Sequence, residues 1–216
     1  MLELTVRIIM VGILLILSTM SFLMFSAEYR IATLNLKTNV EAFDFWRQNA
    51  PPIFYSGRSA SKLSQYCIVA TQGEFLMFES EDFKKQARKN CGALAIVLER
   101  DQYALAEAAL IKSGNLFHSN DSLGALSALE VSYHLSPRDQ WLSARRIRLS
   151  LFFGITNDEI FESDTRTLVS SRQGLDEFVK LYLLNPNLRD LLLSAADTFT
   201  TIDRLRFLRR IKELGH

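Results

Sequence analysis

The chain has 216 residues, a formal net charge of +1 and a hydrophobic content of 48%. This length predicts one domain, or one domain with an appendage. The nearly neutral balance excludes the basic composition that is typical of nucleic-acid binding, and it also excludes an acidic, disordered tail. The hydrophobic content is high for a soluble domain, and much of it lies in one segment near the N-terminus.

That segment, residues 8–27 (IIMVGILLILSTMSFLMFSA), contains no charged residue. A helix of about 20 apolar residues spans about 30 Å of hydrocarbon, so the segment predicts a transmembrane helix after a short N-terminus of residues 1–7, which is cytoplasmic if the domain that follows is exported. A cleaved signal peptide is the alternative. Its apolar core is normally shorter, and Phe25 stands where cleavage after Ala27 requires a small residue. We therefore predict an uncleaved signal anchor.

The charges that flank this segment do not decide its orientation. On the N-terminal side, Arg7 and the α-amino group are offset by Glu3, while Arg30 and Lys37 follow on the other side. The positive-inside rule therefore favours neither direction. The compartment has to be argued from the cysteines.

Residues 28–58 predict a membrane-proximal helix followed by a linker. Apolar residues recur there at intervals of three or four, namely Leu36, Val40, Phe43 and Trp46. Pro51, Pro52 and Gly57 then interrupt the helical pattern, so the linker is expected over residues 49–59.

Residues 59–216 predict an all-α domain of antiparallel helical hairpins, because apolar residues keep a helical spacing and proline is rare. Helix starts are expected at residues whose side chains cap helices, namely Ser80, Asp121 or Ser122, and Asp139. Helix ends are expected at Gly154, Asn185 and Gly215.

The stretch AEAALIKSGNLFHSNDSLGALSALEVSYHLSP resembles a tetratricopeptide repeat. Ala125, Leu129, Ser132 and Pro137 match the small, large, small and proline positions of the second helix of that repeat, and Trp141 matches the first-helix aromatic of a following unit. The resemblance covers roughly residues 59–154. It implies stacked hairpins, as a right-handed superhelix or a compact bundle, and it transfers no functional residue.

The only two cysteines, Cys67 and Cys91, predict a disulfide. If one helix ends near Phe78 and Ser80 caps the next, the two cysteines are equidistant from Glu79 and face each other across the hairpin. That arrangement meets the Cα separation that a disulfide needs. A disulfide predicts a periplasmic domain, since such bonds persist in oxidising compartments.

Two other interpretations of the cysteines remain open. They could be buried free thiols, which pack as small hydrophobic groups. Alternatively, YCIVATQGEFLMF could form a β-hairpin that turns at Gln72 and Gly73, which would separate the cysteines differently. A metal site is disfavoured because no further cysteine or histidine stands at ligand spacing.

No sequence motif supplies a reaction centre. The three histidines, His118, His134 and His216, have no nucleophile or acid at a recognisable spacing, and no GxSxG, HExxH or P-loop motif occurs. We therefore predict a protein that is not an enzyme, with no catalytic residue, no cofactor and no metal.

Arginines are concentrated in two places. Arg145, Arg146 and Arg148 lie within one turn of a predicted helix and are candidates for an interaction surface that binds carboxylates of a partner protein or an acidic polysaccharide. The alternative is a solvated outer face.

The second basic cluster comprises Arg204, Arg206, Arg209, Arg210 and Lys212. These residues are interspersed along a predicted capping helix. That helix would pack through an apolar stripe of Leu205, Leu208, Ile211 and Leu214. Most of the charge is then expected to face water, with docking on a membrane surface as the alternative.

The layout, and especially LSPRDQWLSARRIRLSL, is similar to single-span, extracytoplasmic helical-repeat proteins of bacterial exopolysaccharide synthesis and export. This resemblance implies a bitopic inner-membrane protein with a periplasmic scaffold. Its expected partners are the inner membrane, other envelope-assembly proteins and an acidic polysaccharide. Two alternatives remain, a component of a pilus, secretion or division complex and a carbohydrate-binding protein.

Overall fold

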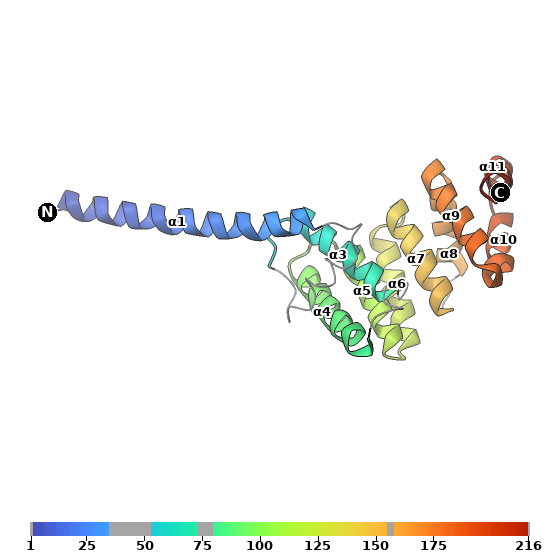
Figure 1. Ribbon diagram of the computed structural model, residues 1–216, viewed down its shortest axis with the longest axis horizontal. Helices are drawn as coiled ribbons and strands as arrows, with labels where there is room; N and C mark the ends of the chain where they lie inside the picture. The colour runs from blue at the N-terminus through green and yellow to red at the C-terminus, as the bar shows by residue number, and fades with distance from the viewer. Residues whose placement is uncertain (1, 35–52, 73–79, 155–157, 216) are drawn as a thin grey trace.

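The computed structural model of the protein describes residues 2–34, 53–72, 80–154 and 158–215, and these residues are helical with short connections (Figure 1). No β-strand occurs among them. The helices are α1 (Leu2–Thr33), α3 (Gly57–Thr71), α4 (Glu81–Arg100), α5 (Leu105–His118), α6 (Ser122–Leu135), α7 (Gln140–Phe153), α8 (Asp158–Val169), α9 (Arg172–Leu184), η1 (Pro186–Leu188), α10 (Arg189–Asp197) and α11 (Thr201–Leu214). The all-α prediction with an N-terminal apolar helix is confirmed.

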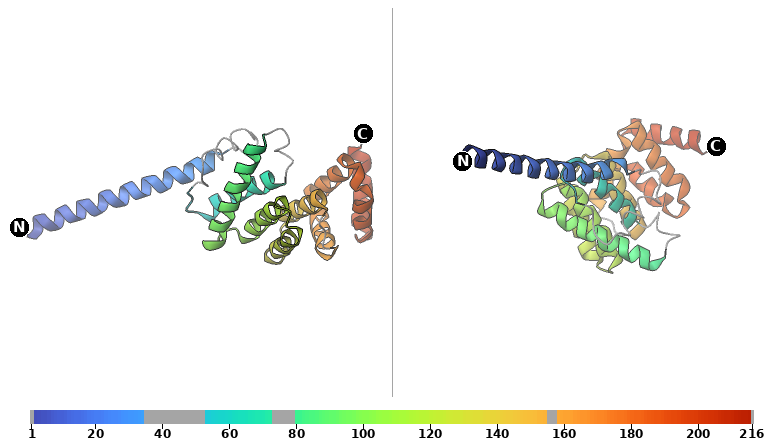
Figure 2. Two further views of the ribbon diagram at one scale, coloured as in Figure 1. Left: turned by 90° about the horizontal axis from the view of Figure 1, so that it is seen from below. Right: turned by 60° about the vertical axis from the view of Figure 1, so that its left-hand side comes forward.

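Helix α1 projects alone from one end of the helical domain, and α11 lies at the opposite end (Figures 1 and 2). Residues 7–33 have a mean hydropathy of 2.6 over their most apolar window, and none of that window is buried. The Thr19 hydroxyl donates to the carbonyls of Leu15 and Ile16, both at 2.8 Å, so it leaves no unpaired polar group. α1 is therefore long and apolar enough to serve as a membrane anchor or a signal sequence.

The predicted linker after α1 ends earlier than residue 59, because α3 already begins at Gly57. The predicted helical stripe from Leu36 to Trp46 lies outside the described residues. The domain begins slightly earlier than residue 59, because Ser56 caps α3 by accepting a hydrogen bond from the Ser59 N–H at 3.2 Å.

The helix starts predicted at Ser80, Asp121 and Asp139 and the ends predicted at Gly154, Asn185 and Gly215 are confirmed. Ser80, Asp121 and Asp139 cap α4, α6 and α7 through side-chain oxygens that accept from backbone N–H groups three residues later. α7 ends at Gly154, whose φ of 63° lies in the left-handed region that glycine adopts without strain. Asn185 and Gly215 occupy the ends of α9 and α11.

The helices pack in chain order and share two hydrophobic clusters. The first is built mainly from α3 to α7 and includes Ile31 of α1. The second is built from α7 to α11. α7 contributes to both, with Leu149 in the first and Ile147 in the second, so it joins the two halves of the stack.

A glycine sets the approach of α5 to α3. A Cβ atom at Gly114 would lie 2.8 Å from Cβ of Thr71, closer than side chains pack. The absence of a side chain at this position lets the two helices come together, and it brings the C-terminal ends of α3 and α5 into contact.

Candidate functional site

The disulfide between Cys67 of α3 and Cys91 of α4 is present, with a Cα–Cα separation of 5.3 Å. Both cysteines are completely buried in the first hydrophobic cluster. α3 ends at Thr71, and the helix end predicted near Phe78 lies outside the described residues. The alternative β-hairpin is wrong in its first arm, because residues 66–71 are helical.

A bonded junction joins α1 to the helical domain. The Glu28 carboxylate accepts hydrogen bonds from the backbone N–H groups of Tyr55 and Ser56, at 2.6 and 3.0 Å. It also accepts from the hydroxyls of Ser56 and Ser59, both at 2.6 Å. A carboxylate is favourable at this place because the first N–H groups of α3 lack intrahelical partners.

Two further contacts hold the same junction. Lys62 of α3 donates its ammonium proton to the carbonyl of Ala32 at 2.7 Å. Ile31 is buried in the first hydrophobic cluster. We call the bonded set of Glu28, Ile31, Ala32, Ser56, Ser59 and Lys62 the anchor junction. In the sequence Glu28 is only the first charge after the apolar residues 8–27, and no local pattern connects it to residues 27–31 positions away.

The predicted arginine surface is wrong for Arg146. This side chain is 0% exposed and forms two hydrogen bonds with the carboxylate of Asp164, at 2.7 and 2.6 Å. Its remaining donors face the carbonyls of Ser132 and Ser136 and the hydroxyl of Ser143. Arg146 is buried because α6 and α8 cover this face of α7, so it cannot bind an external carboxylate.

The pKa of the Asp164 carboxyl depends on Arg146. Burial raises the pKa of the Asp164 carboxyl, whereas hydrogen bonds from Arg146 and Ser143 lower it. The Ser143 hydroxyl donates to Asp164 at 2.8 Å. The pair thus links α7 to α8, and Arg146 also reaches the C-terminal end of α6.

The other two arginines of the predicted surface also have partners within the domain. Arg148 pairs with Glu177 of α9 at 3.0 Å, and its side chain is mostly covered. The Arg145 guanidinium lies 5.4 Å from the centre of the Trp141 ring, which is typical of a cation–π contact. Their role in binding a partner stays a prediction.

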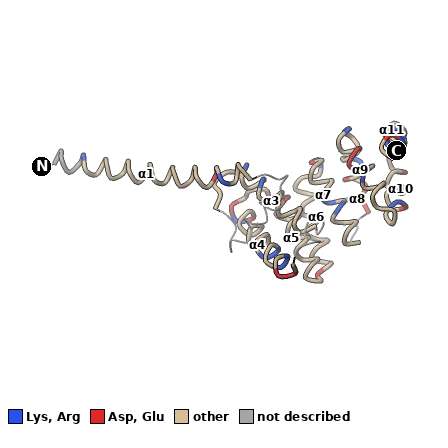
Figure 3. Tube along the Cα trace, viewed as in Figure 1, with Lys and Arg blue, Asp and Glu red and all other residues tan. Residues whose placement is uncertain are grey.

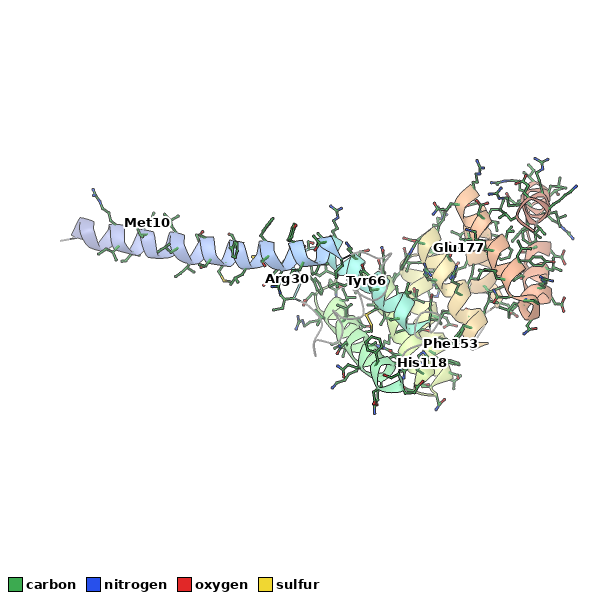
Figure 4. All side chains as sticks on the ribbon, in the orientation of Figure 1. Met10, Arg30, Tyr66, His118, Phe153 and Glu177 are labelled. Atoms are coloured by element: carbon green, nitrogen blue, oxygen red, sulfur yellow. A yellow bond between two sulfur atoms is a disulfide. The ribbon has the colours of Figure 1, made fainter. Side chains whose placement is uncertain are left out.

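His118 lies at the C-terminal end of α5, beside Phe153 of α7 (Figure 4). Its Nε2–H group donates to the Thr71 carbonyl at 3.0 Å. Its ring meets the edge of Phe153 at 5.3 Å between centroids, and Phe117 stacks on Phe153 at 3.7 Å. Partial burial lowers the pKa of His118, with a further lowering from Arg88 and opposing contributions from Thr71 and Glu81.

The His118 environment predicts a pH-dependent stability. An unfolded histidine has a pKa of about 6.5, and the folded value is lower, so the folded state favours the neutral ring. The associated stability is complete above about pH 6.5 and is lost as the pH falls through the lower folded value. The melting temperature of the full chain is therefore expected to fall between pH 7.5 and 5.

A substitution of His118 tests whether this side chain causes the pH dependence of the melting temperature. His118→Gln is expected to flatten the pH dependence of the melting temperature. Equal slopes in the wild-type chain and in His118→Gln would contradict the assignment.

A cationic hollow of about 460 Å³ lies between α4 and the end of α5. Lys85, Arg88 and Lys89 line it together with Asn115, and α4 is visibly rich in basic residues (Figure 3). Within the described part of the chain, none of these three cations forms a salt bridge, and the buried Asn115 carboxamide oxygen accepts no hydrogen bond. The hollow is therefore suited to an anionic group that accepts several hydrogen bonds.

Among the described residues there is no group of three or more His, Cys, Asp or Glu side chains that could hold a metal ion. The chain matches no protein-family model, no curated protein and no solved structure. Ala125, Leu129 and Ser132 are buried where α6 faces the core, but the tetratricopeptide resemblance itself stays a prediction.

Proposed function

We propose that this chain is a membrane-anchored, non-enzymatic scaffold protein of the bacterial envelope. In this proposal α1 is a single span in the inner membrane and the helical domain lies in the periplasm. The domain docks components of exopolysaccharide synthesis or export. The apolar α1 supports the anchor, and the disulfide supports an oxidising compartment.

The anchor junction is the observation that carries this proposal. The last turn of α1 is part of the domain's own core through Ile31, and Glu28 bonds to the start of α3. A domain on a free linker would rotate with respect to the bilayer, whereas a bonded junction favours one orientation. A scaffold benefits from this because a fixed orientation raises the effective concentration of its docking face near membrane partners.

The experiment that tests the proposal combines secretion with co-purification. Deletion of the gene is expected to lower secreted exopolysaccharide, and the full chain should restore it. The full chain purified in mild detergent should carry polysaccharide-assembly proteins. Glu28→Ala should restore secretion less well than the control Glu99→Ala, which alters a half-buried side chain of α4 that pairs with Lys112. Unchanged secretion, with recovery of pilus, secretion or division proteins instead, would favour the alternative envelope machine.

The cationic hollow favours a second function, binding of an acidic polysaccharide. Lys85→Ala, Arg88→Ala and Lys89→Ala combined are expected to abolish retention of the full chain on an alginate column at low salt, because they remove three cations that form no salt bridge with any described residue. Retention of the wild-type chain should decrease as salt is raised, since exposed charges are screened.

The control is Arg145→Ala with Arg148→Ala, which removes the two arginines of the surface predicted from sequence that are not fully buried. This control should leave retention unchanged. Loss of retention in the control alone would return the binding role to the arginines of α7.

A further inference from the structure

α11 packs on the domain through a different face from the one that its sequence predicts. Phe207 is 1% exposed, and its ring lies 5.3 Å from Phe178 and 5.8 Å from Tyr182, between centroids. Of the predicted stripe, Ile211 packs against the second cluster, whereas Leu205, Leu208 and Leu214 are exposed. The predicted packing stripe is therefore wrong for these three leucines.

The consequence is an apolar stripe that points away from the domain. Ile202 is 71% exposed, Leu205 63% and Leu208 49%. Residues three apart lie on one side of a helix, and Leu205 is nearly opposite the buried Phe207 because two residues turn the helix by about 200°. We call Ile202, Leu205 and Leu208 the α11 stripe.

Cations border the α11 stripe. A hollow of about 260 Å³ between α9 and α11 is lined by Arg172, Arg206, Arg209 and Arg210. Arg210 is held by Asp176 and Glu213, at 2.8 and 2.7 Å, and Arg206 pairs with Asp203 at 2.9 Å. Arg172 and Arg209 form no salt bridge with any residue that the structure describes. Two guanidiniums are thus available to external carboxylates.

We infer that the α11 stripe and the adjoining arginines dock an amphipathic helix of a partner protein, one whose apolar face is flanked by carboxylates. This inference rests on the proposed scaffold function. An apolar stripe accepts the apolar side chains of such a helix, and guanidiniums bind carboxylates with two parallel hydrogen bonds. The basic border therefore selects an acidic partner.

Two other occupants fit the surface less well. A symmetric contact between two copies would bring the basic borders of both stripes to one interface, where like charges repel. The bilayer that holds α1 lies at the other end of the molecule, since α1 and α11 are at opposite ends of the stack (Figures 1 and 2). A protein helix of complementary charge avoids both difficulties.

The experiment places a photo-reactive benzophenone amino acid at Leu205 of the full chain in the bacterium that encodes it. A matched chain carries the same group at Leu123, which is 84% exposed and belongs to α6, in a different part of the stack from α11 (Figure 1). The Leu205 position is expected to give one protein adduct, whose cross-linked peptide has apolar residues at helical spacing flanked by Asp or Glu. Arg172→Glu with Arg209→Glu should lower its yield by about fivefold or more, whereas Lys89→Glu should not.

The outcomes separate this inference from the proposed function. The inference would be overturned by an adduct between two copies, a lipid adduct, an adduct with a basic peptide, or no adduct at Leu205. It would also be overturned if charge reversal left the adduct yield unchanged. If Leu123 rather than Leu205 cross-links to polysaccharide-assembly proteins, the scaffold function stands and the docking face is elsewhere. Because both arginines are exposed, their reversal should leave the melting temperature unchanged, and a lower value would show that the loss of yield reflects unfolding.

Discussion

Asp164→Ala is expected to destabilise the helical domain by about 3–5 kcal/mol, because it leaves the Arg146 guanidinium buried without its carboxylate. Both side chains are at most 1% exposed, so water cannot replace the lost partner. The measurement is urea unfolding of the full chain in detergent micelles, followed by tryptophan fluorescence. The helicity of α1 in the micelle does not contribute to this signal.

Two variants make the Asp164 prediction specific. Asp197→Ala removes an exposed ion pair with Arg204 and should leave the unfolding curve unchanged, since such pairs contribute little. Arg146→Met with Asp164→Leu removes both charges together and should recover part of the lost stability. A loss below about 1 kcal/mol in Asp164→Ala would show that the pair does not hold α7 to α8.

Cys67→Ala with Cys91→Ala is expected to destabilise the domain by about 3 kcal/mol, since the disulfide closes a loop between residues separated by 24 positions and restricts the unfolded chain. Reduction of the wild-type chain by dithiothreitol should lower its stability similarly. The same urea unfolding in micelles measures both.

The reducing agent also provides the control, because it should have no effect on the variant that lacks both cysteines.

The compartment of the domain is tested separately. In protein extracted from native membranes, a thiol-alkylating reagent applied after denaturation should modify neither cysteine. Alkylation of both would remove the main support for the periplasmic location and, with it, for a role in envelope assembly.

The sequence predicted the helix limits well because they depend on local chemistry. The side chains of Ser80, Asp121 and Asp139 bond to N–H groups three residues away, so the signal and its partner lie in one short segment. Gly154 ends α7 because glycine adopts the left-handed conformation without strain. The pairing of the two cysteines could also be predicted from the sequence, because the apolar stripes of two consecutive helices have to face each other.

The arginines of α7 show where local patterns fail. ARRIRL distributes charge around the helix, so its periodicity favours no single outer face. Only the packing of α6 and α8 on α7 decides that Arg146 is internal, and only the position of Asp164 makes that burial tolerable. A sequence window contains neither fact, since Asp164 lies 18 positions away.

The sequence by itself determined the apolar N-terminal helix, the all-α class, most helix ends and the identity of the disulfide partners, because each follows from residues close in the chain or from hydrophobic periodicity. The tertiary structure alone decided that Glu28 joins α1 to α3, that Arg146 is buried and that Phe207 rather than Leu205 faces the core. These outcomes depend on which surfaces meet, and that is set by shape and polar pairing between distant segments.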